Sequence, residues 1–215
     1  MSGRVRSTAR DERRRSYGQN FLVDRPLIDR FVAGLDLGPD DHVIDLGAGR
    51  GALTWPLAGT GATVWAVESD PVWSDRLRAA IDAASTHRVR VIPTDLRRLR
   101  LPKEPYRVVA NPPFGLTTEL LRLLLDRPER GPTRADLILQ LEVARKHAAS
   151  PPSTLRTAAW APWWEFELGP IIRRGSFRPQ PAVDAAVLTI RKRQPAILPE
   201  RLAPTFAERL RADWQ

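Results

Sequence analysis

Residues 42–51 read HVIDLGAGRG, and this stretch decides the fold of the 215-residue chain. Its first half has the apolar, β-branched character of a buried strand, and three glycines follow at G-x-G-x-G spacing. Glycines placed in this way let backbone amides approach a ligand closely and turn the chain tightly into a helix. The spacing differs from the G-x-G-x-x-G of dinucleotide sites, and no P-loop lysine follows.

Strand-like and helix-like segments alternate on both sides of this turn. Further strands are expected within 62–70, 89–96, 106–114, 135–149 and 181–193, and helices within 27–37, 52–61, 71–84 and 117–126. Alternation over more than half the chain predicts an α/β fold, with a mostly parallel sheet and helices on both faces. In such a sheet the ligand binds beyond the carboxyl ends of the strands, where the special motifs of this chain fall.

Two carboxylates stand at the ends of the next two expected strands. Glu68 is placed to accept hydrogen bonds from ribose hydroxyls, and Asp95 is placed to meet an adenine amine. Taken singly, such an acid is more often a helix cap, and Asp70 and Asp95 both stand beside expected helix starts. Together with the glycine turn they favour an adenosine-type cofactor. Without a phosphate cradle, S-adenosylmethionine fits better than NAD or ATP.

The rigid corner Asn111-Pro-Pro-Phe114 ends the fourth expected strand. The Asn111 side-chain oxygen and the Pro112 carbonyl are two acceptors that could hold both hydrogens of an adenine amine beside a methyl donor. The prolines fix the backbone in advance. Phe114 would stack on the unstacked base. The alternative is a proline-rich loop with a core phenylalanine.

Composition limits the classes of protein and site. Cysteine is absent, which excludes disulfides and thiolate metal sites, and the three histidines lack ligand spacing, so no metal is expected. The first residues are polar and Arg-rich rather than apolar, and no apolar run approaches the length of a membrane span. We therefore expect a cytoplasmic protein that makes no membrane contact.

The formal net charge is +9, and arginine carries most of the positive charge. Arginine suits phosphate contacts and base stacking, although a GC-rich coding sequence is the alternative explanation. Clustering favours a polyanion partner. One cluster occupies an expected flexible basic arm, residues 1–15: Arg4, Arg6, Arg10, Arg13, Arg14 and Arg15. The other lies near the opposite end: Arg173, Arg174, Arg178, Arg191, Lys192 and Arg193.

A tryptophan-rich segment follows residue 159. Trp160, Trp163 and Trp164 are either RNA-stacking residues or core aromatics that cover a sheet edge. Aromatic residues in such numbers are more often core residues, so we favour the second interpretation.

With these residues in place, the chain resembles the rRNA adenine N6-methyltransferase family, which includes macrolide-resistance methylases and small-subunit rRNA adenine dimethyltransferases. Tyr17-Gly-Gln-Asn-Phe-Leu22 is similar to the family's first cofactor motif, and DLGAGRGALT, Glu68, Asp95 and NPPF are similar to its next four motifs, in order. Ser176–Asp184 matches its F-x-P-x-P-x-V-D segment. The resemblance covers roughly residues 16–193.

The resemblance implies a Rossmann-like class I S-adenosylmethionine-dependent methyltransferase domain over 16–193. It implies these roles in cofactor binding: Gln19, Asn20 and Leu22 hold the methionine end, Gly47 and Gly49 border it, Glu68 binds the ribose, Asp95 binds the adenine, and Asn111 touches the reacting methyl. In catalysis, Asn111 and Pro112 hold the target amine, and Phe114 stacks on the target base. Of the basic residues, we assign Arg173, Arg174 and the six arginines of the arm to RNA binding.

The segments EPYRVVANPPFGLTTELL and STLRTAAWAPWWEFELG are most similar to actinomycete-type macrolide-resistance methylases. That subgroup implies one adenine in the peptidyl-transferase loop of protein-free or immature 23S rRNA as the target. Two features depart from the family. Pro112 stands where the family usually has Ile or Leu, and only a short helical tail, residues 194–215, stands where the family has a helical C-terminal domain.

Other functions stay open at this stage. Within enzymes, the alternatives are a 16S rRNA adenine dimethyltransferase and a DNA adenine N6-methyltransferase, although the F-x-P-x-P-x-V-D segment argues against the DNA enzyme. Outside enzymes, the alternative is an RNA-binding or transcription factor on the same fold. We expect a monomer, and the sequence does not decide between one methyl group and two.

Overall fold

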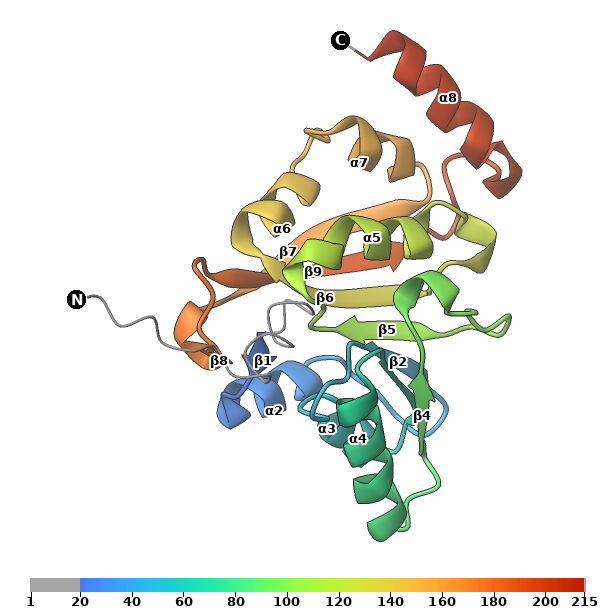
Figure 1. Ribbon diagram of the computed structural model, residues 1–215. Coiled ribbons are helices and arrows are strands. Elements are labelled where there is room, and N and C mark those ends of the chain that lie inside the picture. Colours follow the sequence, from blue (N-terminus) through green and yellow to red (C-terminus); the bar gives the residue numbers. More distant parts are fainter. Residues whose placement is uncertain (1–19, 215) are drawn as a thin grey trace, which may run out of the picture.

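The computed structural model describes residues 20–214, whose centre is a seven-stranded sheet with helices on both faces (Figure 1). In spatial order the strands are β4 (Val89–Pro93), β3 (Thr63–Glu68), β2 (His42–Leu46), β5 (Arg107–Ala110), β6 (Arg134–Gln140), β9 (Ala185–Lys192) and β7 (Trp164–Ile172). The first five are parallel, and β9 runs antiparallel to both β6 and β7. The predicted α/β architecture is therefore confirmed.

The helices divide between the two faces of the sheet. The α-helices are α2 (Arg25–Ala33), α3 (Thr54–Gly59), α4 (Pro71–Ala83), α5 (Thr117–Leu125), α6 (Leu141–His147), α7 (Leu155–Trp160) and α8 (Ala203–Asp213). The 3₁₀ helices are η1 (Leu96–Arg98), η2 (Phe114–Leu116), η3 (Pro128–Arg130), η4 (Arg174–Ser176) and η5 (Glu200–Leu202). Buried side chains of α2, α3 and α4 form one apolar cluster with the sheet, and those of α5, α6 and α7 form the other. No helix among residues 20–214 is both long and apolar enough to cross a membrane.

The central strands contribute side chains to both clusters in alternation. In β2, Val43 belongs to the cluster beneath α2–α4 and Ile44 to the cluster beneath α5–α7, and both are fully buried. Val109 and Val108 of β5 divide in the same way. A strand covered on both faces needs apolar residues at every position, so its sequence reads as a continuous apolar run.

A small second sheet joins two distant parts of the chain. β1 (Phe21–Leu22) pairs antiparallel with β8 (Phe177–Arg178). The Ser176 hydroxyl also donates to Asp24 Oδ2 over 3.0 Å. The end of the first motif thus lies against the F-x-P-x-P-x-V-D segment. Sequence reasoning predicted neither this pairing nor strand β7.

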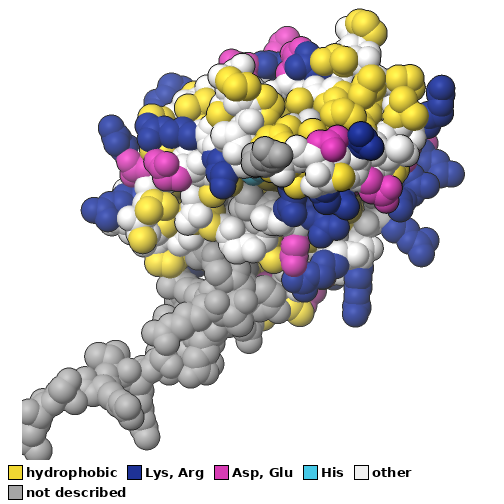
Figure 2. Space-filling view, turned by 90° about the horizontal axis from the view of Figure 1, so that it is seen from above, with side chains coloured by type: hydrophobic (Ala, Val, Ile, Leu, Met, Phe, Trp, Pro, Cys, Tyr) yellow, Lys and Arg dark blue, Asp and Glu magenta, His cyan; other side chains and the backbone are white. Residues whose placement is uncertain are grey.

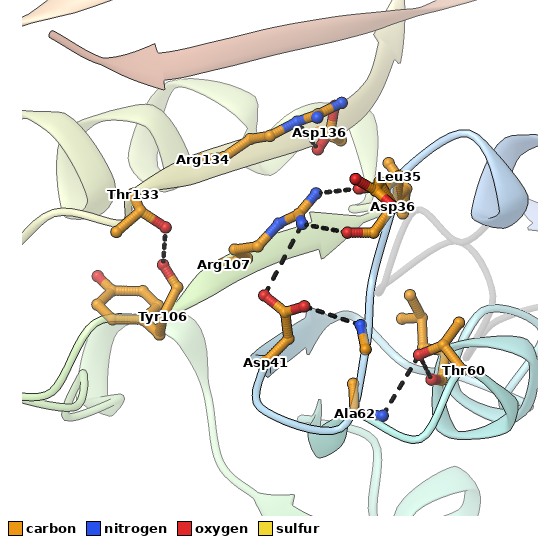
Figure 3. Close-up of polar contacts among 12 residues, drawn as sticks. Leu35, Asp36, Asp41, Thr60, Ala62, Tyr106, Arg107, Thr133, Arg134 and Asp136 are labelled. Atoms are coloured by element: carbon orange, nitrogen blue, oxygen red, sulfur yellow. Dashed lines mark hydrogen bonds and ion pairs between the residues drawn. The ribbon is translucent and has the colours of Figure 1, made fainter.

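A polar network fastens the chain after α2 to the sheet (Figure 3). The Arg107 guanidinium, at the start of β5, donates to the backbone carbonyls of Leu35 and Asp36 and lies 3.8 Å from a carboxylate oxygen of Asp41. On neighbouring β6, the buried Asp136 carboxylate pairs with Arg134 over 2.8 Å. In the chain, α2 follows β1 directly. By fixing the segment after α2, this network therefore also helps to hold α2 and β1 in place.

The tryptophans of the last third of the chain are core residues. Trp160, Trp163 and Trp164 are 4%, 1% and 0% exposed, so the core interpretation is confirmed. Their indole N–H groups donate to an Asp126 carboxylate oxygen, the Leu198 carbonyl and the Leu125 carbonyl, respectively. Buried indoles usually need such a partner, because an unmet N–H would be costly.

Gly131 provides a test of this packing. A Cβ atom there would lie 2.4 Å from the Trp164 ring and 2.7 Å from the Leu124 carbonyl oxygen. We expect Gly131→Ala to lower the free energy of unfolding by about 1–3 kcal/mol through overpacking, measured by urea denaturation. Gly59→Ala is the matched control, since no atom beyond its chain neighbours and the backbone of its own helix lies within 4 Å of its Cβ position. The control should be neutral or slightly stabilising, and equal losses in the two variants would contradict this account.

Candidate active site

A cavity of about 470 Å³ opens at the carboxyl ends of β2, β3, β4 and β5. Its size is typical of a site for a small organic ligand. Its lining includes eight of the residues that the sequence singled out: Asn20, Leu22, Gly47, Gly49, Glu68, Asp95, Asn111 and Pro112. Gln19 lies outside the described residues.

The glycine turn adopts a backbone conformation that side chains disfavour. Gly47 and Gly49 have φ values of 84° and 52°, in the left-handed region. A Cβ atom at Gly49 would also lie 3.0 Å from the Phe21 ring. Gly47 N–H and Ala48 N–H both donate to the Val67 carbonyl at the end of β3. These amides are therefore committed within the fold, and the turn is not built as a phosphate cradle.

Glu68 links the glycine turn to the next helix. Its carboxylate is 4% exposed, and its two oxygens accept from Gly49 N–H and Asp70 N–H, each over 2.7 Å. Burial raises the pKa of Glu68, and the two backbone hydrogen bonds oppose that shift. Each oxygen keeps a further lone pair for a ligand hydroxyl. The carboxylate thus combines a structural contact with a place on the cavity wall.

Asp70 and Asp95 both cap helices, so the helix-cap interpretation is confirmed for both. Asp70 accepts from Val72 N–H at the start of α4. Asp95 Oδ1 accepts from Arg97 N–H at the start of η1, over 2.8 Å. Asp95 nevertheless lines the cavity, and its predicted contact with adenine stays a prediction.

Asn111 is held in place from one side only. Its Nδ2 group donates to the Asn20 carbonyl over 2.9 Å, which ties the end of β5 to the chain just before β1. Its Oδ1 atom is buried and accepts no hydrogen bond from residues 20–214. A buried acceptor without a partner is costly, so its presence on a cavity wall indicates a ligand donor. Pro112 is buried directly beside it.

Asp45 is a cavity residue that sequence reasoning did not single out. It is 1% exposed, accepts from the Thr54 hydroxyl over 2.6 Å through Oδ2, and its Oδ1 has no partner within residues 20–214. Burial raises its pKa to about 7, and the nearby Glu68 carboxylate adds to the shift. An acid inside a buried apolar strand, two residues before Gly47, was the available signal.

A stack of aromatic rings and guanidinium groups stands beside the glycine turn. Arg50 Cζ lies 4.9 Å from the centroid of the Phe21 ring and 4.6 Å from that of Trp73. Arg76 Cζ lies 5.1 Å from the same indole, and the Phe21 and Trp73 rings meet edge to face. Such cation–π contacts hold β1 against the turn. No sequence pattern indicates this stack, because its members come from three separate segments.

Phe114 is not among the residues that line the cavity. It is half-buried at the start of η2 and packs against the apolar cluster beneath α2–α4. Its stacking on a target base stays a prediction.

The second cluster of basic residues is divided between the two ends of the sheet. Arg173 and Arg174 lie beyond the end of β7, where Asp184 pairs with the Arg173 guanidinium and accepts from Arg174 N–H. At the opposite end of β9, three residues form ion pairs: Arg191 with Glu167, Lys192 with Glu200, and Arg193 with Glu165. The arginines of the arm lie outside the described residues.

Comparison with known proteins places this geometry in a family. The family model for ribosomal RNA adenine dimethylase matches residues 10–211. The chain belongs to the ribosomal RNA adenine dimethylase family. The predicted resemblance is thereby confirmed.

Individual members of the family are similar over most of the chain. An rRNA adenine N-6-methyltransferase of Corynebacterium diphtheriae is 40% identical over 179 residues, 83% of this chain and 68% of the relative. The mycinamicin-resistance protein MyrB of Micromonospora griseorubida is 36% identical over 198 residues, 92% of this chain and 62% of the relative. The chain therefore spans about two thirds of the length of these relatives.

A solved structure supports the same placement. The 23S rRNA methyltransferase ErmE superposes with a TM-score of 0.78 at 29% identity, over 89% of this chain and 78% of that one. The expected methyltransferase fold is thus confirmed. S-adenosylmethionine is the co-substrate that membership of the family implies. Among residues 20–214, no group of three or more His, Asp or Glu side chains could hold a metal ion.

The buried Asp45 predicts a particular dependence of stability on pH. An unfolded chain releases this proton near the ordinary pKa of 3.8, whereas the folded protein keeps it up to about pH 7. The folded state therefore binds more protons between these values, and the free energy of unfolding should fall as pH rises through them, by at most about 1.4 kcal/mol per pH unit.

Asp45→Asn removes this titration and keeps an acceptor for Thr54. Urea denaturation of both proteins between pH 4.5 and 8 should show a shallower fall for the variant across pH 4.5–7. Parallel curves for the two proteins would contradict the assignment.

Proposed function

We propose that this protein transfers a methyl group from S-adenosylmethionine to the N6 amine of one adenine in the peptidyl-transferase loop of 23S rRNA, and so confers resistance to macrolide-type antibiotics. Membership of the family and the functions of the similar proteins support the reaction class and the substrate. The observation that carries the proposal is the buried Oδ1 of Asn111 on the cavity wall, which accepts no hydrogen bond from residues 20–214.

The residues present fit S-adenosylmethionine. The cofactor carries an adenosine and a methionine but no phosphate, in keeping with a glycine turn whose amides are bonded within the fold. Glu68 keeps lone pairs for ribose hydroxyls, Asp95 stands where adenine is expected, and the orphaned Asp45 Oδ1 offers a further acceptor. Asn20, Leu22, Gly47 and Gly49 border the same cavity, and with Gln19 they would hold the methionine end.

S-adenosylmethionine, when bound, supplies an electrophilic methyl group, and the chain's task is to present the amine to it. An adenine amine is a poor nucleophile because its lone pair is delocalised into the ring. Asn111 Oδ1 and the Pro112 carbonyl would accept its two hydrogens and aim the lone pair outward, while Phe114 stacks on the base. The acceptors are preorganised, since Asn20 holds the amide and the prolines hold the backbone. The Asn111 Oδ1 atom is buried, which limits competition from water for its hydrogen bond.

The proposal includes an organisation for RNA binding. Residues 1–15 would be a basic arm that contacts phosphates, 16–193 the methyltransferase domain, and 194–215 a helical tail. Arg173 and Arg174, at the active end of the sheet, would contact the RNA as well. We propose that the protein acts as a monomer, in the cytoplasm, on protein-free or immature ribosomal RNA.

The test is transfer of labelled methyl from S-adenosylmethionine to protein-free 23S rRNA, with the modified base mapped by primer extension. We expect a stop at one peptidyl-transferase adenine. Asn111→Ala should lower kcat about a hundredfold or more, because it removes an acceptor needed in the transition state. Cofactor affinity should change little, as measured by calorimetry. An unchanged kcat in the variant would remove Asn111 from the mechanism.

The same assay separates the alternatives. Label in 16S rRNA alone would indicate a small-subunit dimethyltransferase, and label in duplex DNA alone a DNA adenine methyltransferase. Cofactor binding with no label in any nucleic acid would contradict the proposed reaction. Failure to bind S-adenosylmethionine, with RNA binding intact, would favour a non-enzymatic RNA-binding protein on this fold.

Removal of residues 1–15 tests the basic arm. If its six arginines contact phosphates, the truncated protein should bind 23S rRNA more weakly, and the slope of log K against log[salt] should flatten. Filter binding between 50 and 300 mM salt measures both. Unchanged affinity and slope would dismiss the arm as a phosphate contact.

A further inference from the structure

A second, larger depression begins where the cofactor cavity ends. It has a volume of about 1170 Å³ and lies over the outer side of α5, bordered by the chain from Leu96 to Tyr106 and by the loop around η3. Leu96 and Arg97 line both the cavity and this depression, so the two are continuous. We call it the α5 groove.

Basic side chains outnumber acidic ones around the α5 groove. Its seven basic residues are Arg97, Arg100, Lys103, Arg122, Arg127, Arg130 and Lys192. Its four acidic residues are Glu104, Glu119, Asp126 and Glu129. Figure 2 shows dark-blue side chains gathered at the lower right of the face seen there, with fewer acidic ones among them. A concave surface with such an excess of positive charge attracts a polyanion.

The positive charges of the α5 groove are not all neutralised within the protein. Three are in ion pairs: Arg97 with Glu119, Arg122 with Asp126, and Lys192 with Glu200. The other four are exposed and form no ion pair with any residue of 20–214: Arg100, Lys103, Arg127 and Arg130. Three of these four are arginines, whose guanidinium groups match phosphate geometry.

The α5 groove runs from one end of the sheet to the other. Arg97 lies at the carboxyl end of β4, beside the cavity, whereas Tyr106 and Thr133 stand just before β5 and β6, at the opposite end of the sheet. The nine residues of α5 between these ends span about 13 Å at 1.5 Å per residue. A stacked strand that rises about 3.4 Å per nucleotide would place about four nucleotides over that distance.

We propose that the α5 groove holds the phosphate backbone of the RNA strand that flanks the target adenine. Arg100, Lys103, Arg127 and Arg130 contact phosphates, and the apolar floor of Leu99, Leu101 and Leu123 lies against sugars and base edges. These contacts position the strand without reading its sequence, so that the adenine next to it reaches Asn111. The inference rests on the proposed function for the identity of the RNA but is tested without methyl transfer.

The first experiment compares two triple variants. Arg100→Gln with Arg127→Gln and Arg130→Gln removes charge from the α5 groove. The matched control, Arg30→Gln with Arg78→Gln and Arg211→Gln, removes three exposed arginines that do not line it. Each is titrated with a transcript of the peptidyl-transferase domain of 23S rRNA and with a short stem-loop that carries only the loop with the target adenine.

On the long transcript the groove variant should bind about tenfold or more weakly than the wild-type protein. Its salt slope should fall by about 2–3, roughly one for each phosphate that the variant no longer neutralises. On the stem-loop, which contains the nucleotides next to the target adenine, it should also bind more weakly than the control, because the α5 groove holds that strand. S-adenosylmethionine affinity should be unchanged in all proteins, which shows that the cavity is intact. Equal behaviour of the groove variant and the control on the long transcript would overturn the proposal.

The second experiment uses the absence of cysteine. Lys103→Cys and Arg78→Cys each create a single attachment point for an iron chelate that cleaves nearby RNA by hydroxyl radicals. Cleavage from position 103 should fall within a few nucleotides of one side of the target adenine, with none there from position 78. No cleavage from position 103 in a bound complex would overturn the proposal, and would leave the groove to a partner other than RNA.

These outcomes are separate from the fate of the proposed function. Suppose that the wild-type protein methylates 23S rRNA, but that the groove variant loses no affinity and position 103 gives no cleavage. The proposed reaction would then stand, and the proposed role of the α5 groove would be rejected. If the wild-type protein binds the long transcript through the groove but transfers no methyl group, the proposed reaction would be rejected and the role of the α5 groove would stand. Absence of RNA binding by the wild-type protein would reject both.

Discussion

The Glu68 carboxylate is the contact on which the rest of the site depends. It lies at the end of β3, almost fully buried, and accepts from a backbone amide of the glycine turn and from one at the start of α4. Two loops from neighbouring strands are thereby held against a single side chain. Because the amides of Gly47 and Ala48 are bonded to β3 as well, the turn is fixed before any ligand arrives. The cost is a buried carboxylate whose pKa is raised.

The proposed chemistry also depends on contacts between segments that are far apart in the sequence. Asn111 is held by the Asn20 carbonyl, and the adjoining β1 pairs with β8, more than 150 residues later. The Arg107 network fixes the chain that follows α2 to the start of β5, the strand that leads into Asn111 (Figure 3). The Asn111 Oδ1 atom is thus presented to the cavity without a hydrogen-bond partner among the described residues, while Asn20 holds the other end of its amide. That is preorganisation: the acceptor is in place before the amine arrives.

The sequence was sufficient for the parts of this account that local patterns encode. The apolar runs predicted the parallel strands, and the acids and the Asn-Pro-Pro-Phe corner at their ends predicted part of the cavity wall. What it could not predict depends on tertiary pairing. β1–β8 joins two-residue strands too short to have a pattern, and the Phe21–Arg50–Trp73 stack draws on three segments. Charge clustering also could not reveal that Arg191, Lys192 and Arg193 form ion pairs at the far end of the sheet from the cavity.

The most direct measurement of the central claim is calorimetric titration of the wild-type protein with S-adenosylmethionine and, separately, with ATP. A cavity that offers carboxylate and amide acceptors, beside a turn whose amides are already bonded, should bind one S-adenosylmethionine per chain and leave ATP unbound. Glu68→Ala should abolish the binding, because it removes both the ribose acceptor and the contact that holds the turn. Binding of ATP in preference to S-adenosylmethionine, or full affinity in the variant, would contradict the account.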